Sequence, residues 1–197
     1  MAIKWDEYRI EHKDHIHALG VIVSTYNSLE FTLFFFFCRY HQIRPPIGQS
    51  IFAGLNNYQR VNFTRNKLNE SNEDDRSKGW VNHFLSAYDI VTENKNFLVH
   101  SSVIINTTEQ EHITFGKGSK TQPNNWSFAH MTVDDLRKVA EEIGTLHEFG
   151  TAVQAWLEAR ETGGSFRLQG KAVWTPPLPE TPPLPDRLKN VPDGVLQ

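Results

Sequence analysis

The sequence predicts a mainly α protein, a helical bundle of about four helices with a small β-hairpin insertion and a proline-rich C-terminal tail. Three patterns support this prediction. Apolar residues recur at three- and four-residue steps over long stretches, one β-branched run interrupts them, and a proline-rich repeat follows the last stretch. With 197 residues and 39% hydrophobic content, the chain can bury one sizeable core. We therefore expect a helical domain over residues 1–164, with the hairpin at about 102–116, and an extended tail over residues 165–197.

The first expected helix, one long or once-broken helix, runs from about Trp5 to His41. Its apolar residues keep helical spacing, and no proline interrupts the chain before Pro45. Residues 34–37 are four consecutive phenylalanines, which point nearly all the way round the axis because each residue turns the helix by about 100°. A helix of this kind needs neighbours on every side. We expect these neighbours to include a second copy of the chain, in a homodimer.

Residues 18–38 are long enough to cross a bilayer, so a membrane span has to be weighed. Asn27 and Glu30 lie near the centre of this stretch, where a carboxylate alone costs about 2.5–3.5 kcal/mol. Residues 1–14 are rich in charge and lack the apolar segment of a signal peptide. A single cysteine, Cys38, leaves no internal disulfide. We therefore expect a cytoplasmic protein with no membrane contact.

The middle of the chain should hold two more helices. The Pro45-Pro46 pair is expected to end the first helix, and a second helix should follow over about 47–58 or beyond. The polar, acidic stretch 66–75 suits a loop or a helix start. A third helix is expected from about residue 76 to residue 101.

A short β segment and a long helix should follow. The β-branched runs at 103–108 and 112–115 predict the hairpin, with a polar loop over 116–125. A helix should then begin after Thr132, because Asp134 and Asp135 would stand in its first turn, where the helix dipole favours acids. Apolar residues recur at helical spacing from that point, and a glycine pair at 163–164 marks the expected end.

The tail contains a tandem repeat, residues 175–180 and 181–186, in which each unit reads Thr-Pro-Pro-Leu-Pro followed by an acid. Proline's fixed φ favours an extended polyproline II conformation. Such a segment suits an aromatic groove on a protein partner. The alternative is a tail that packs on its own domain or on a second subunit.

The third helix carries the most chemistry-like residues of the sequence. His100, Asn96, Glu93 and Asp89 recur at helical spacing, and Lys95 precedes Asn96. The opposite, apolar stripe comprises Trp80, Phe84, Tyr88, Val91 and Leu98. A polar stripe of this kind is either a solvated face or a site. A histidine at a helix C-terminus can also be explained without catalysis, as a cap for free backbone carbonyls.

Glu30 favours the site interpretation. It lies within the apolar first helix, where an unpaired carboxylate would be costly. His100, Lys95 or Asn96 would relieve that cost. We therefore expect Glu30 to face this group on the third helix.

The run Lys95-Asn96-Phe97-Leu98-Val99-His100, followed by Ser101, resembles the motif of the HEPN superfamily of helical nucleotide-binding and ribonuclease domains. That motif is Arg, a polar residue that is often Asn, three residues, and His, at the end of a bundle helix. Asn27-Ser28-Leu29-Glu30 on the first helix is also similar to these proteins. The resemblance covers roughly residues 16–101. It departs from the family at Lys95, which occupies the arginine position.

The resemblance implies metal-independent cleavage of RNA at a dimer interface, where two copies of the motif face one phosphate. His100 would be the general acid or base, Asn96 would orient a partner, and Lys95 would stabilise the charged phosphorane. Lysine keeps the positive charge but lacks the planar fork of arginine. Glu30 would support the site.

Composition limits the other functions. A net charge of −3 gives no global basic field, so contact with RNA would have to be local. The nine histidines are scattered without zinc-ligand spacing, and we expect no metal and no cofactor. Two hypotheses result. The first is a HEPN-like RNA-associated protein, which in its more specific form is an endoribonuclease of a defence or toxin–antitoxin type. The alternative is a non-catalytic dimerisation and protein-interaction module that uses the proline-rich tail.

Overall fold

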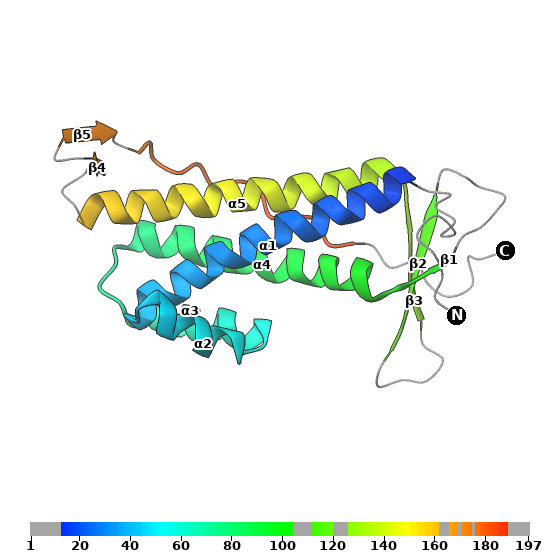
Figure 1. The fold of residues 1–197 in the computed structure, drawn as a ribbon, viewed down its shortest axis with the longest axis horizontal. Helices are drawn as coiled ribbons and strands as arrows, with labels where there is room; N and C mark the ends of the chain where they lie inside the picture. The colour runs from blue at the N-terminus through cyan, green and yellow to red at the C-terminus, as the bar shows by residue number, and fades with distance from the viewer. Residues whose placement is uncertain are drawn as a thin grey trace.

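The computed structural model describes residues 13–104, 112–119, 126–161, 166–168, 171–174 and 176–188. Within these ranges the protein is mainly helical. The helices are α1 (Lys13–His41), α2 (Pro45–Ala53), α3 (Asn57–Glu70), α4 (Asp75–His100) and α5 (Val133–Glu161). Figure 1 shows the long helices α1, α4 and α5 side by side, with α2 and α3 against one end of the bundle. The predicted fold class is therefore confirmed, with five helices among the described residues instead of about four.

The C-terminus of α1 is set by its own hydrogen bonds and not by the proline pair. Gln42 adopts a positive φ of 54°, and the amides of Gln42 and Ile43 donate to the carbonyls of Arg39 and Cys38, both at 3.1 Å. This is the Schellman arrangement that ends many helices. The prolines instead occupy the first turn of α2, where a missing N–H costs nothing. The expectation that Pro45 and Pro46 end α1 is therefore wrong.

The single helix expected over 47–58 is divided in two. Asn56 caps α3, because its side chain accepts a hydrogen bond from the Gln59 amide while the Gln59 side chain accepts one from the Asn56 amide, at 2.9 and 3.0 Å. This capping box begins a new helix that continues through Glu70. Of the stretch 66–75, expected as a loop or a helix start, residues 66–70 thus belong to α3, and Asp74 and Asp75 cap and begin α4.

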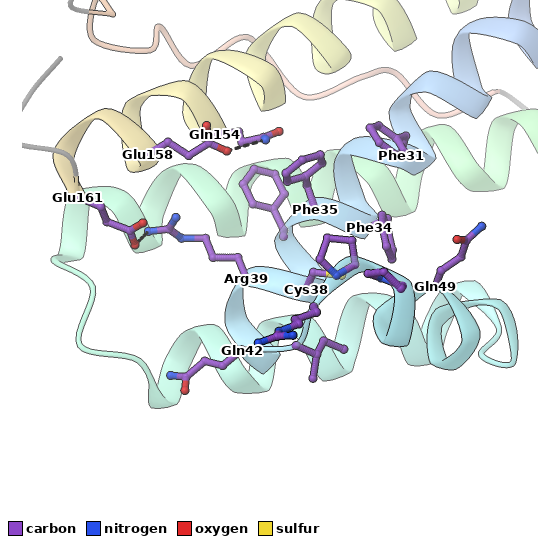
Figure 2. A pocket seen from close by; sticks show the side chains of 15 residues that line it. Phe31, Phe34, Phe35, Cys38, Arg39, Gln42, Gln49, Gln154, Glu158 and Glu161 are labelled. Carbon is purple, nitrogen blue, oxygen red and sulfur yellow. Dashed lines mark hydrogen bonds and ion pairs between the residues drawn. The ribbon is translucent and has the colours of Figure 1, made fainter. Parts of the chain in front are cut away.

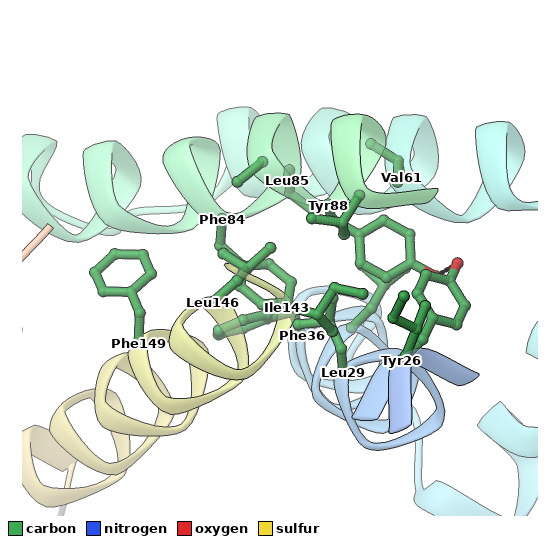
Figure 3. Packing of buried hydrophobic residues seen from close by; sticks show 14 of the residues in the cluster. Tyr26, Leu29, Phe36, Val61, Phe84, Leu85, Tyr88, Ile143, Leu146 and Phe149 are labelled. Atoms are coloured by element: carbon green, nitrogen blue, oxygen red, sulfur yellow. Dashed lines mark hydrogen bonds between the residues drawn. The ribbon is translucent and has the colours of Figure 1, made fainter. Parts of the chain in front are cut away.

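The core lies between α1, α4 and α5, with α3 on one side. Figure 3 shows Leu29 and Phe36 of α1 meeting Phe84 of α4 and Ile143 of α5. The rings of Phe36 and Phe84 pack edge to face, with centroids 5.0 Å apart. The phenylalanine run is therefore divided between the core, which takes Phe36 and Phe37, and the half-buried positions 34 and 35.

The β segment is a three-stranded antiparallel sheet at one end of the bundle, where α4 ends (Figure 1). Its strands are β1 (Ser102–Ile104), β2 (Ile113–Gly118) and β3 (Trp126–Met131). Phe115 of β2 is fully buried and pairs with Ala129 of β3. The sequence predicted only the first two strands, because residues 126–131 have no regular apolar alternation. Their strand is defined by its backbone hydrogen bonds to β2. Residues 105–111 and 120–125 lie outside the described residues.

The last helix begins as predicted. Thr132 and Asp135 form a reciprocal cap, since Thr132 Oγ1 accepts from the Asp135 amide at 3.1 Å and Asp135 Oδ2 accepts from the Thr132 amide at 2.8 Å. The helix reaches Glu161, and the glycine pair expected to end it lies outside the described residues. A two-stranded ribbon of β4 (Phe166–Leu168) and β5 (Lys171–Trp174) follows, which the sequence did not predict.

The proline-rich segment 176–188 is extended and runs back along the bundle toward the sheet (Figure 1). Pro176 and Pro179 are buried, and residues 182–185 line a pocket with α5 residues 138–146. The carbonyl of Asp186 and the amide of Leu188 bond to the Asn94 side chain of α4. The described part of the tail is therefore docked on the helical domain.

Among the described helices, α1 has the length and apolar composition that a membrane-spanning helix requires. In the structure, 44% of its most apolar stretch is buried inside the bundle.

Candidate functional site

The two predicted faces of α4 are present. Every member of the apolar stripe is buried, with at most 7% of each residue exposed for Trp80, Phe84, Tyr88, Val91 and Leu98. On the polar face, Glu93 and His100 are exposed, and Asp89 and Asn96 are half-buried. The helix therefore presents its polar residues at the surface of the bundle.

Lys95 and Asn96 are in direct contact. The Lys95 ammonium donates to Asn96 Oδ1 at 3.0 Å and lies 4.4 Å from the centre of the Tyr26 ring of α1. The cation therefore interacts with a ring face and an amide oxygen. Burial lowers the pKa of Lys95, and the nearby Glu30 carboxylate opposes this shift.

His100 is the last residue of α4 and is exposed. It lies one turn beyond Asn96 on the same helical face. No hydrogen bond or ion pair joins its imidazole to another described residue. The ring is thus free to meet a ligand from solvent, and its position at the helix C-terminus also suits the capping role.

Glu30 does not bond directly to the group on α4. Its carboxylate pairs with Arg60 of α3, and 34% of its side chain is exposed. The expectation that His100, Lys95 or Asn96 would be the direct partner is therefore wrong. Arg60 of α3, which packs on α1, takes the Glu30 carboxylate, and Lys95 is left with a longer-range attraction to it.

A polar network that the sequence did not predict connects these groups. The Tyr26 hydroxyl lies 2.8 Å from the Tyr88 hydroxyl (Figure 3). It also lies 2.9 Å from Thr92 Oγ1 and accepts from Asn57 Nδ2 at 3.1 Å. Arg60 in turn donates to Asn57 Oδ1 at 3.1 Å. Burial raises the pKa of Tyr26 and Tyr88, so both hydroxyls stay protonated. The network fixes the ring on which Lys95 rests.

A second set of polar groups adjoins Asn96 on its other side. The Lys117 ammonium of β2 donates to the Asn96 carbonyl at 3.3 Å. Arg187 of the tail pairs with Glu93, one turn before Asn96. These residues line a pocket of about 490 Å³. No sequence signal placed Lys117 or Arg187 here, because they lie on separate segments far along the chain.

A larger pocket of about 820 Å³ lies apart from the predicted site (Figure 2). Phe31, Phe34 and Phe35 of α1 line it, with the α5 residues Gln154 and Glu158 opposite. Cys38 also lines this pocket, and it is in close contact with Gly48 of α2. A Cβ on Gly48 would come within 2.4 Å of Cys38 Sγ, so a side chain there would force Cys38 to shift.

In the part of the chain that the structure describes, no cluster of three histidine, cysteine or acidic side chains has the geometry to hold a metal ion. The chain matches no protein-family model, and no curated protein or solved structure is detectably similar to it. The HEPN resemblance therefore depends on residues 27–30 and 95–101 alone.

Proposed function

We propose that the protein is a HEPN-like, RNA-associated protein that acts as a metal-independent endoribonuclease. The observation that carries the proposal is the last turn of α4. There an exposed imidazole, His100, stands one turn from Asn96, and the ammonium groups of Lys95 and Lys117 both bond to Asn96. Neither ammonium group forms an ion pair with a described carboxylate. This local positive charge offsets the net charge of −3 and suits a phosphate.

The roles follow from these positions. His100 would take the proton of the RNA 2′-hydroxyl or protonate the leaving oxygen, which requires an imidazole open to solvent. Lys95 would stabilise negative charge on the phosphorane, and Asn96 would orient the phosphate or the imidazole. Glu30 would act through Arg60 and Tyr26, by fixing the ring beneath Lys95.

The proposal includes a homodimer, a cytoplasmic location and a role in defence or in a toxin–antitoxin pair. Two copies of the motif would face one phosphate across the dimer axis. Sedimentation of the purified chain at micromolar concentration tests the dimer, because a monomer under those conditions contradicts this part of the proposal.

The test of the reaction is a cleavage assay in buffer with EDTA, on a panel of tRNA and mRNA substrates. We expect the wild type to cut and His100→Ala to lose at least about 100-fold in rate, the usual contribution of a general acid or base. His17→Ala, an exposed histidine of α1, is the matched control and should cut like the wild type. Sedimentation and melting temperature should be unchanged in both variants. A wild type that leaves the whole panel uncut contradicts the enzyme proposal.

The alternative function, a non-catalytic module whose tail binds a protein partner, has less support. Residues 176–188 are docked on their own domain, and two of their prolines are buried. The exposed Leu178 and Leu184 remain available to a partner. A partner that stays bound after deletion of residues 171–197 would contradict this alternative.

A further inference from the structure

The pocket beside Asn96 is assembled from three segments. Helix α4 supplies Glu93 and Asn96, strand β2 supplies Lys117, and the tail supplies Arg187. At about 490 Å³ it is large enough for a phosphate with its attached sugar. It lies on the same face of α4 as His100, one turn away.

Asn94 determines where Arg187 stands. This residue is 3% exposed, and its amide group donates to the Asp186 carbonyl at 2.8 Å while its oxygen accepts from the Leu188 amide at 3.1 Å. Both bonds are to backbone atoms, on either side of residue 187. Lys138 of α5 anchors the same segment through the Asp186 carboxylate at 2.7 Å. Arg187 is therefore held at the pocket whatever its own side chain binds.

The Arg187 side chain is available for a ligand. It is 61% exposed, and its described ion pair is with Glu93, which is equally exposed. Exposed pairs of this kind contribute little to stability. The guanidinium can thus leave Glu93 for a stronger acceptor, since phosphate accepts two parallel N–H bonds from arginine.

We propose that Lys117 and Arg187 form a phosphate-binding subsite beside His100, which the docked C-terminal tail completes and which holds a phosphodiester of the RNA strand next to the one that is cut. This inference rests on the proposed function and deepens it. Two cations and the Asn96 amide match a phosphate. Glu93 competes with the ligand for Arg187 and so limits the affinity.

The test measures binding of a short, fluorescently labelled single-stranded RNA with 2′-O-methyl sugars, which keeps the phosphates but lacks the attacking hydroxyl. We expect Lys117→Gln and Arg187→Gln each to weaken binding about 5- to 10-fold at low salt. Each should also lower the slope of log K against log salt by about 1, because one phosphate contact is lost. Inorganic pyrophosphate should compete with the RNA for the wild type and much less for either variant.

Glu93→Gln separates a binding role from a structural one. If Arg187 binds phosphate, removing the competing carboxylate tightens binding a few-fold, the opposite of Arg187→Gln. If the Arg187–Glu93 pair only clamps the tail, both variants weaken binding alike, and the proposal is overturned. Lys67→Gln and Glu70→Gln are matched controls, because they change the same charges in an exposed pair of α3 at the far end of the bundle. Both should stay within twofold of the wild type.

The outcomes for this subsite and for the proposed function can be told apart. Unchanged affinity in Lys117→Gln and Arg187→Gln overturns the subsite, while cleavage that depends on His100 would still stand. A wild type that binds neither the RNA nor pyrophosphate also overturns the subsite. Pyrophosphate binding that depends on Arg187, in a protein that cuts no RNA, would retain the subsite and contradict the ribonuclease.

Discussion

At Gly150 of α5, helices α1 and α4 both approach α5 closely. A Cβ at this position would lie 2.6 Å from a ring carbon of Phe84 in α4 and 2.7 Å from the Thr32 methyl in α1. Both neighbours are buried, and Thr32 Oγ1 also lies 3.0 Å from His147 Nδ1. The absence of a side chain at one residue thus allows the helices to pack closely.

We predict that Gly150→Ala lowers the free energy of unfolding by about 1–3 kcal/mol, because the added methyl overpacks the contact. Gly144→Ala is the control on the same helix, since its nearest neighbour would be the Thr25 methyl at 4.0 Å. Alanine there should stabilise the helix by up to about 1 kcal/mol. Urea unfolding measures both. Equal effects would mean that the close contact is not a constraint.

Some of the predicted site residues contact other partners than the sequence suggested. Lys95 and Asn96 do meet, and they do so as neighbours on one helix. Glu30 was correctly identified as a carboxylate in need of a partner, and that partner is Arg60. Local spacing places residues on one face of one helix, but it does not tell which residue of another helix lies opposite.

At the scale of elements, the tail behaves as part of the domain. It crosses α4 and α5, and its contacts with α4 include the two bonds of the buried Asn94 and the Arg187–Glu93 ion pair. A buried side-chain amide without hydrogen-bond partners would lower the stability of the fold. The tail therefore provides the partners that the Asn94 amide needs, and Asn94 provides those of the tail backbone. The extended conformation was predictable from the prolines, whereas the docking surface was not.

We predict that Asn94→Ala releases the tail and lowers the free energy of unfolding by about 1–3 kcal/mol, since two backbone groups lose their partner. Tryptic cleavage after Arg187 should become faster, and electrophoresis under native conditions follows its rate. Asn66→Ala, an exposed position of α3, is the control and should change neither quantity by much. A tail equally protected in Asn94→Ala would show that other contacts hold it.

At the scale of the whole molecule, an ion network closes the end of the bundle opposite the sheet. Glu73, which precedes α4, bonds to Arg39 at the end of α1 at 3.1 Å and pairs with Arg160 at the end of α5. Arg39 also reaches Glu161 at 2.7 Å (Figure 2). Only 10% of the Glu73 side chain is exposed, so solvent screens this carboxylate weakly.

We predict that Glu73→Gln destabilises the protein by about 1–3 kcal/mol, because two guanidinium groups lose a nearly buried carboxylate. Glu70→Gln removes an exposed carboxylate paired with Lys67 and should cost less than about 0.5 kcal/mol. Thermal unfolding of both variants and the wild type, at low and at high salt, measures the two losses of stability. The Glu70 effect should vanish at high salt, and most of the Glu73 effect should remain. If both disappear together, the network is no more than a surface feature.

The sequence by itself determined what depends on neighbours along the chain. Helical spacing separated the buried stripe of α4 from the face that carries Asn96 and His100, and the cap at Thr132 marked the start of α5. These features follow from backbone geometry within a few residues, so they can be recognised without a fold. The mainly α class and the extended tail were predictable for the same reason.

Only the tertiary structure decided which distant residues meet. Arg60 lies 30 residues from Glu30, Lys117 lies 21 from Asn96, and Asp186 lies 92 from Asn94. Strand β3 is another feature that only the tertiary structure decided, because it is defined by its hydrogen bonds to β2 and not by a pattern in its own sequence. Such contacts depend on how helices, sheet and tail pack together, which no local periodicity encodes. The motif on α4 was therefore readable from the chain, while the charges that surround it became known only from the packed bundle.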